Sequence, residues 1–234
     1  MTKNRQPSRV VREQLAKEQR RKRTLWTAAV AAAVLVLAGL IGWGIYASQK
    51  PSSYSVPAHG SSDGTGVVAG SGPATVDVYL DFMCPHCKAF EEEAGSALAS
   101  LASGGKAAVV YHPVAFLDGA STTRYSTRSS ASSGCAADGD KFVEYASALF
   151  ARQPAEGGPG LTDDELIQVG GSVGLVDPAF AQCVRDGKYT SWVSHVNDGA
   201  GEKGVNGTPT VFVNGRSVQA TAAAITAAVE TAAR

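Results

Sequence analysis

The chain has 234 residues, and its 21 lysines and arginines balance its 21 aspartates and glutamates, so its formal net charge is zero. The balance hides a split, because nine basic and two acidic residues precede Leu25, which leaves twelve basic and nineteen acidic residues in the rest. We interpret the basic segment, which adjoins an apolar stretch, as a determinant of membrane topology and not as a nucleic-acid-binding surface, and we expect no nucleic-acid partner.

The sequence predicts a cytoplasmic tail over residues 1–24 and a transmembrane helix over residues 25–47. No charge occurs between Leu25 and Ala47, and 23 residues at about 1.5 Å each give roughly 34 Å of helix, enough to cross a bilayer. For cleavage after Ala47, Ile45 would stand at the minus-three position, where signal peptidase needs a small residue, so we expect an uncleaved anchor in the lipid bilayer. The basic charge predicts that residues 1–24 stay in the cytoplasm and that the chain after Ala47 lies on the extracytoplasmic side of the cell membrane.

Residues 48–65 are rich in serine, glycine and proline, which is the composition of a flexible linker. The remaining residues, 66–234, are enough for one hydrophobic core and therefore for one domain. A short strand is expected at 66–69. A second, half-buried strand is expected from Val76 to Phe82, where apolar and polar residues alternate.

The motif Cys84-Pro85-His86-Cys87 follows that second strand directly. A helix is expected over 88–101, so Cys84 stands at a helix N-terminus, where unpaired backbone N–H groups and the helix dipole favour a thiolate. Pro85 suits the first helical turn because its missing N–H is no loss there, and a protonated His86 adds positive charge near the sulfur. The motif therefore predicts a reversible redox disulfide between Cys84 and Cys87.

A single Cys-x-x-Cys motif also occurs in zinc sites, in structural bridges and by chance. A closed zinc site needs four ligands, and the sequence has neither a second such motif nor histidines paired at helical spacing. His59, His112 and His195 stand singly. We therefore expect no metal site and no cofactor.

The segment after the motif predicts a strand and then several helices. Residues 107–111 read as the strand, and 141–152 shows apolar residues at helical spacing. Thr162 and Glu165 fit a capping box at the start of another helix, and Asp177-Pro178 fits an N-cap followed by proline in the first turn.

Cys135 and Cys183 both lie in this helical region. Exported domains face an oxidising compartment, and two cysteines remain after the motif has taken two. We therefore predict a structural disulfide between Cys135 and Cys183, with two separate buried thiols as the alternative.

Gly207-Thr208-Pro209 leads into the apolar run 211–213, which reads as a buried strand that proline is allowed to open. Asn214-Gly215 then predicts a hairpin, and an alanine-rich helix follows it. Together, the strand–Cys-Pro-His-Cys–helix unit and the Gly-Thr-Pro–strand unit resemble the thioredoxin fold. The Pro-His dipeptide resembles the DsbA-like branch of thiol-disulfide oxidoreductases.

The resemblance extends over residues 66–234 and implies an α/β chain: a thioredoxin fold with a helical subdomain inserted at about 117–203, preceded by the one N-terminal transmembrane helix. It implies that Pro209 follows a cis bond and that Thr208 and Pro209 lie against the cysteines and bind substrate. It also implies two kinds of partner, unfolded exported proteins with free cysteines and a membrane reoxidase that is DsbB-like or VKOR-like.

One position departs from the family pattern. Thioredoxins and many DsbA-like proteins carry a buried acidic residue six positions before the first active-site cysteine, and this chain has Val78 there. Strand alternation places the neighbouring Asp77 and Asp81 on the opposite face from Val78. We therefore expect that proton transfer uses water or another group.

The leading hypothesis is a membrane-anchored, extracytoplasmic oxidase that introduces disulfides into exported proteins. A disulfide reductase or isomerase, for example in cytochrome c maturation, is the alternative within redox chemistry. A non-catalytic binding module or metal chaperone is the alternative outside it. A redox potential near the thioredoxin value of about −270 mV would indicate a reductase, and stoichiometric bound metal would indicate the third class.

Overall fold

The computed structural model of the chain describes residues 9–48 and 53–232. The chain consists of two units, and the boundary between them in the sequence follows Ser52. In the first unit the described residues form one helix, α1 (Arg9–Ser48). Its stretch Leu25–Trp43 is long and apolar enough to cross a membrane, and a signal sequence would share these features. The helix also includes the basic residues from Arg9 on, most of which are good helix formers. Residues 1–8 of the expected tail lie outside the described residues.

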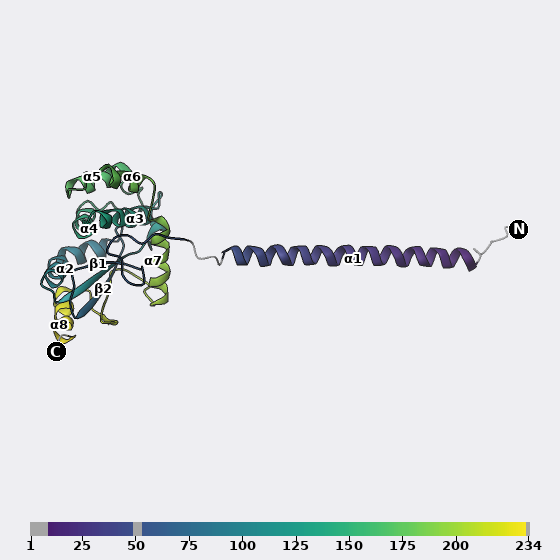
Figure 1. The fold of residues 1–234 in the computed structure, drawn as a ribbon, viewed down its shortest axis with the longest axis horizontal. Coiled ribbons are helices and arrows are strands. Elements are labelled where there is room, and N and C mark those ends of the chain that lie inside the picture. Colours follow the sequence, from purple (N-terminus) through teal and green to yellow (C-terminus); the bar gives the residue numbers. More distant parts are fainter. Residues whose placement is uncertain (1–8, 49–52, 233–234) are drawn as a thin grey trace. The chain divides into compact units, whose positions relative to one another are not determined.

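The second unit is built on a mixed five-stranded sheet in the order β1-β3-β2-β4-β5 (Figure 1). β2 and β3 run parallel, and every other neighbouring pair is antiparallel. The two central strands β2 and β3 are largely buried, as expected for a parallel pair covered on both faces. The strands are β1 (Val67–Ala69), β2 (Ala74–Leu80), β3 (Ala107–Pro113), β4 (Thr210–Val213) and β5 (Arg216–Val218).

Helices cover this sheet and extend away from it. α2 and α8 pack on each other and on the sheet, α7 contacts β3, and α3 and α4 lie between the sheet layer and the outer pair α5 and α6 (Figure 1). The segment from η1 to α7 is inserted between β3 and β4, close to the expected limits of 117 and 203. The helices are α2 (Pro85–Ser103), η1 (Asp118–Ala120), α3 (Tyr125–Asp138), α4 (Phe142–Ala151), α5 (Asp163–Ser172), α6 (Pro178–Arg185), α7 (Thr190–Glu202) and α8 (Ala222–Ala232).

Of the flexible linker expected over 48–65, residues 49–52 lie outside the described residues, and the part from residue 53 on requires a correction. Residues 53–66, which we call the N-terminal strap, belong to the second unit and pack against it. The Tyr54 ring stacks on the His195 ring of α7 at 4.0 Å and its hydroxyl contacts that ring's Nε2 at 2.9 Å. Pro57 is buried, and Ser61 N–H donates to the Gly66 carbonyl next to β1. Contacts with distant parts of the chain order this polar segment, and composition does not reveal them.

Helix α3 was not predicted as a separate element. Its sequence is rich in serine, which competes with the helical backbone for hydrogen bonds and has modest helix propensity. Nearly the whole helix is buried, and its serine hydroxyls donate mainly to backbone carbonyls, as Ser129 does to Tyr125 O at 2.7 Å. Small side chains let α4, α6 and α7 pack around α3, so it forms the centre of the inserted helices.

Candidate active site

The two cysteines of the motif stand at the junction of β2 and α2. Cys84 is the N-cap of α2 in an extended conformation, and Pro85 is the first helical residue. The Cys84 carbonyl accepts from the N–H groups of Cys87 at 3.0 Å and Lys88 at 3.2 Å, so it closes the first turn of the helix. This local geometry follows from the sequence, because proline at the first position needs no N–H partner.

The two thiols are free and differ in environment. Cys84 keeps 6% of its surface exposed, whereas Cys87 is fully buried. A hydrogen bond from the Cys87 thiol lowers the pKa of Cys84 from an ordinary 9.0 to about 5, although burial acts the other way. The Thr208 side chain and then the backbone N–H groups of Cys87 and His86 lower this pKa further. Burial raises the pKa of Cys87 above its usual range. Cys84 is therefore the thiolate at neutral pH and Cys87 the thiol.

Thr208 and Pro209 approach the cysteines from the other side of the fold. The bond between them is cis, and the Cys84 sulfur lies 3.4 Å from the Thr208 carbonyl oxygen, to which it donates only when it is protonated. His86, Thr208 and Pro209 together line an open groove of about 390 Å³ that also includes Phe90. The fold thus brings together the cysteines and the predicted substrate-binding residues, with Pro85 and His86 exposed at the surface.

The predicted role of the His86 charge stays a prediction, and in the structure the His86 backbone N–H acts on the Cys84 sulfur. The His86 ring lies on the wall of the groove.

Two residues near the cysteines were missed as site residues. Gln153, just after α4, donates through Nε2 to the carbonyls of Phe82 and Cys84, each at 3.0 Å. Asp81 is fully buried, and its backbone N–H donates to the Cys87 sulfur at 3.5 Å. No local signal marks Gln153, which is far from Cys84 in sequence. Asp81 was assigned to the far face by strand alternation, but β2 ends at Leu80 and alternation ends with it.

Cys135 of α3 and Cys183 of α6 are joined by a disulfide with an S–S distance of 2.07 Å and a Cα–Cα distance of 5.9 Å. The bridge ties the central helix of the insertion to its outer layer. Neither cysteine lines the groove beside Cys84.

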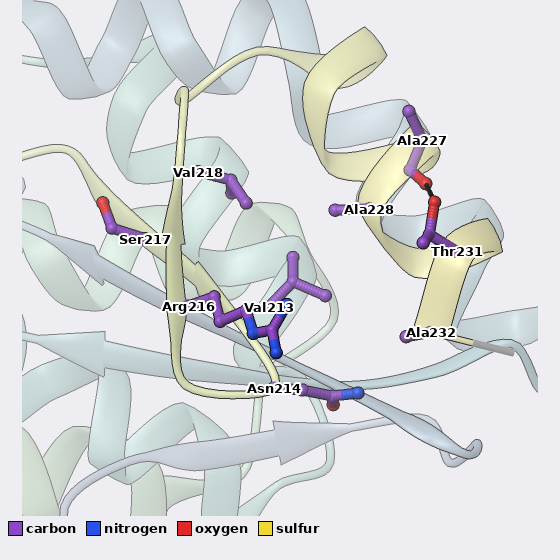
Figure 2. Close-up of a pocket in the computed structure, with 9 residues that line it drawn as sticks. All are labelled: Val213, Asn214, Arg216, Ser217, Val218, Ala227, Ala228, Thr231 and Ala232. Atoms are coloured by element: carbon purple, nitrogen blue, oxygen red, sulfur yellow. Dashed lines mark hydrogen bonds between the residues drawn. The ribbon is translucent and has the colours of Figure 1, made fainter.

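A second cavity, of about 650 Å³, lies between the edge strand β5 and α8 and is shown in Figure 2. Val213 and Arg216 line it from the β4–β5 hairpin, and Thr231 lines it from α8, where its hydroxyl donates to the Ala227 carbonyl at 2.8 Å (Figure 2). None of the predicted site residues lines this cavity. By contrast, His86, Thr208 and Pro209 line the smaller groove.

Comparison with known proteins also relates this chain to the thioredoxin fold. A family model described as thioredoxin matches residues 62–231. The structure of reduced DsbA from Mycobacterium tuberculosis has 32% sequence identity and a TM-score of 0.64, and the match covers 72% of this chain and 92% of that one. The reduced disulfide oxidoreductase DsbG of the same organism has 35% identity and a TM-score of 0.61, covering 69% of this chain and 78% of that one. These matches confirm the predicted thioredoxin fold with its helical insertion.

Among curated proteins, the serine/threonine-protein kinase PknE of Mycobacterium tuberculosis is 32% identical over 161 residues. The match covers 65% of this chain but 28% of the kinase, so this chain spans only about a quarter of that protein's length. The likeness concerns a part of the kinase, and the kinase name says nothing about the chemistry of this chain.

Proposed function

Because this chain belongs to the thioredoxin family, in its DsbA-like group of thiol-disulfide oxidoreductases, we propose that it is an oxidase that introduces disulfides into exported proteins. The observation that carries the proposal is the difference between the two thiols. One is a partly exposed thiolate at a helix N-terminus, and the other is a buried thiol one turn further along.

The reaction follows from that difference. In the oxidised enzyme a substrate thiolate attacks the Cys84 sulfur, the Cys84–Cys87 bond breaks, and a mixed disulfide forms while Cys87 takes up a proton. The second substrate thiol then attacks its partner sulfur, so a substrate disulfide forms and Cys84 leaves as a thiolate. Two electrons pass from the substrate to the enzyme. Cys84 is the better leaving group because its pKa is the lower of the two.

The direction of electron flow depends on how strongly the reduced state is stabilised. At pH 7 a thiol with a pKa of about 5 is ionised. Because the pH is two units above this pKa, ionisation stabilises the reduced state by roughly 2.7 kcal/mol relative to a thiol that stays protonated. For a two-electron couple this makes the potential about 60 mV more oxidising. An oxidase needs a stabilised reduced form, because the enzyme accepts electrons from its substrate and ends each reaction in the reduced state.

Thr208, Pro209 and His86 line the groove beside Cys84 and are proposed to receive an extended substrate segment. The Thr208 carbonyl faces the sulfur, so backbone groups there are available to pair with a substrate strand. Unfolded chains with free cysteines fit such a groove, since backbone pairing depends little on side-chain sequence.

We also propose that α1 anchors the enzyme in the cell membrane as a single span, with residues 1–24 in the cytoplasm and the second unit outside. The apolar stretch Leu25–Trp43 and the basic residues before it support this orientation. Reoxidation of the reduced pair then requires an electron acceptor, and a DsbB-like or VKOR-like membrane protein is the proposed partner. Fusions of a phosphatase after Arg234 and before Leu25 test the topology, and activity only in the second fusion contradicts it.

The redox potential of the full-length chain tests the proposed function. We expect equilibration with glutathione to give a value nearer to that of DsbA, about −120 mV, than to that of thioredoxin, about −270 mV. The protein should also oxidise a reduced, unfolded polypeptide, and Cys84→Ser should abolish this activity. A potential near the thioredoxin value would favour the reductase or isomerase, and failure of the pair to exchange with glutathione would exclude both redox functions.

A further inference from the structure

Asp81 contacts both active-site cysteines through its main chain. Its N–H donates to the Cys87 sulfur at 3.5 Å, and its carbonyl accepts from the Cys84 N–H at 3.0 Å. The residue is fully buried. Any change in the charge of its side chain therefore occurs beside the redox pair and away from bulk water.

Three hydrogen bonds from three segments hold the carboxylate of Asp81. One oxygen accepts from the Met83 N–H at 2.9 Å and from the Ser126 hydroxyl of α3 at 2.7 Å. The other accepts from the Leu117 N–H at 2.9 Å. Such donors stabilise an ionised carboxylate in a buried position.

One of the three donors can also serve a protonated carboxyl. Backbone N–H groups only donate, whereas the Ser126 hydroxyl can turn and accept a hydrogen bond. The carboxyl oxygen that faces Ser126 is therefore the place where a proton can be held, with the Ser126 oxygen as its acceptor.

The groups around Asp81 determine when that proton is favoured. The titratable side chains that face it are the Cys84 and Cys87 thiols of α2 and the Tyr125 phenol of α3. Burial raises the pKa of Asp81, and the negative charge of Cys84 raises it further. The disulfide carries no charge, so the second effect is present only after reduction.

On the basis of the proposed function, we propose that Asp81 takes up the proton that reduction of the Cys84–Cys87 disulfide would otherwise release. A substrate dithiol brings two protons and two electrons. The substrate disulfide forms, the Cys84–Cys87 bond breaks, one proton goes to the Cys87 sulfur, the other goes to the Asp81 carboxylate, and Cys84 is left as a thiolate. Asp81 is thus a positioning residue for the proton and supplies the buried acid that Val78 does not.

The test is the pH dependence of the equilibrium between the full-length chain and glutathione. When reduction of the disulfide by glutathione releases one proton, the apparent equilibrium constant for this reduction rises about tenfold per pH unit. We expect the wild-type constant to rise less steeply over a pH window above the pKa of Cys84, in which Asp81 is ionised in the oxidised state and protonated in the reduced state. Asp81→Asn should restore the tenfold slope throughout this range.

Asp77→Asn is the matched control, since Asp77 lies in the same segment but pairs with His112 at 3.0 Å. It should keep the wild-type slope. A wild-type slope of tenfold per unit throughout, or equal slopes for wild type and Asp81→Asn, overturns the role of Asp81 and leaves the proposed function intact. The proposed function fails separately, if the cysteines do not exchange with glutathione at all.

Infrared difference spectra provide a readout that does not depend on the equilibrium with glutathione. Reduction should produce the C=O band of a protonated carboxyl, and Ser126→Ala should shift this band because it removes the hydrogen-bond acceptor of that proton. If no such band appears on reduction, Asp81 does not hold the proton.

Discussion

Removal of the Cys87 thiol should raise the pKa of Cys84, because the hydrogen bond from Cys87 is the largest contribution to the lowered value. The full lowering, from 9.0 to about 5, corresponds to roughly 5.4 kcal/mol. A hydrogen bond to a charged group is worth about 1.5 to 3 kcal/mol, or about 1 to 2 pKa units. We therefore expect the pKa of Cys84 to be about 6 to 7 in Cys87→Ala.

Cys87→Ser is the matched variant, because its hydroxyl keeps a donor at the same place. Its Cys84 pKa should stay within about one unit of the wild-type value. In both variants Cys84 is the only free thiol, since Cys135 and Cys183 are bridged, so ultraviolet absorbance of the thiolate can be titrated without interference. Equal Cys84 pKa values in the alanine and serine variants would refute the assignment of the shift to the Cys87 hydrogen bond.

Three further predictions concern stability. Replacing Cys135 and Cys183 together by alanine should lower the free energy of unfolding by about 4 kcal/mol in a denaturant titration, because the bridge closes a loop across 48 residues of sequence separation. The redox potential of the other pair should not change. Gln153→Leu should cost about 1 to 3 kcal/mol by the same titration and alter the rate at which Cys84 is alkylated, because the carbonyls of Phe82 and Cys84 lose their donor. Finally, the pKa of Cys84 is lower in the folded state than in the unfolded chain, so ionised Cys84 stabilises the reduced protein. This stabilisation should be complete above about pH 9 and should disappear as the pH falls through about 5. Thermal unfolding of Cys84→Ser should lack this pH dependence.

Local signals predicted the parts of the fold that local interactions stabilise. Thr162 and Glu165 form the expected capping box at α5, with both of its reciprocal hydrogen bonds. Asn214 and Gly215 both adopt positive φ, at 47° and 74°, as a two-residue hairpin turn requires. The Cys-Pro-His-Cys motif begins its helix at Pro85 for the same reason, since proline in the first turn acts only on its neighbours.

Tertiary contacts explain what the sequence did not reveal. The strap is ordered by pairs such as Tyr54 and His195, which are 141 residues apart. Asp81 is buried because α3 and the segment after β3 supply donors to it, so its place depends on elements that no periodicity near Asp81 predicts. Gln153 likewise reaches the active-site turn through the packing of α4 on α2.

The bridge within the helical insertion makes the proposed enzyme a member of its own substrate class. Under the proposed function, a newly exported chain has four thiols, which can pair in three ways, and only one of the three leaves Cys84 bonded to Cys87. An oxidised copy can supply the Cys135–Cys183 bond to a new one, and the new copy can then do the same for the next.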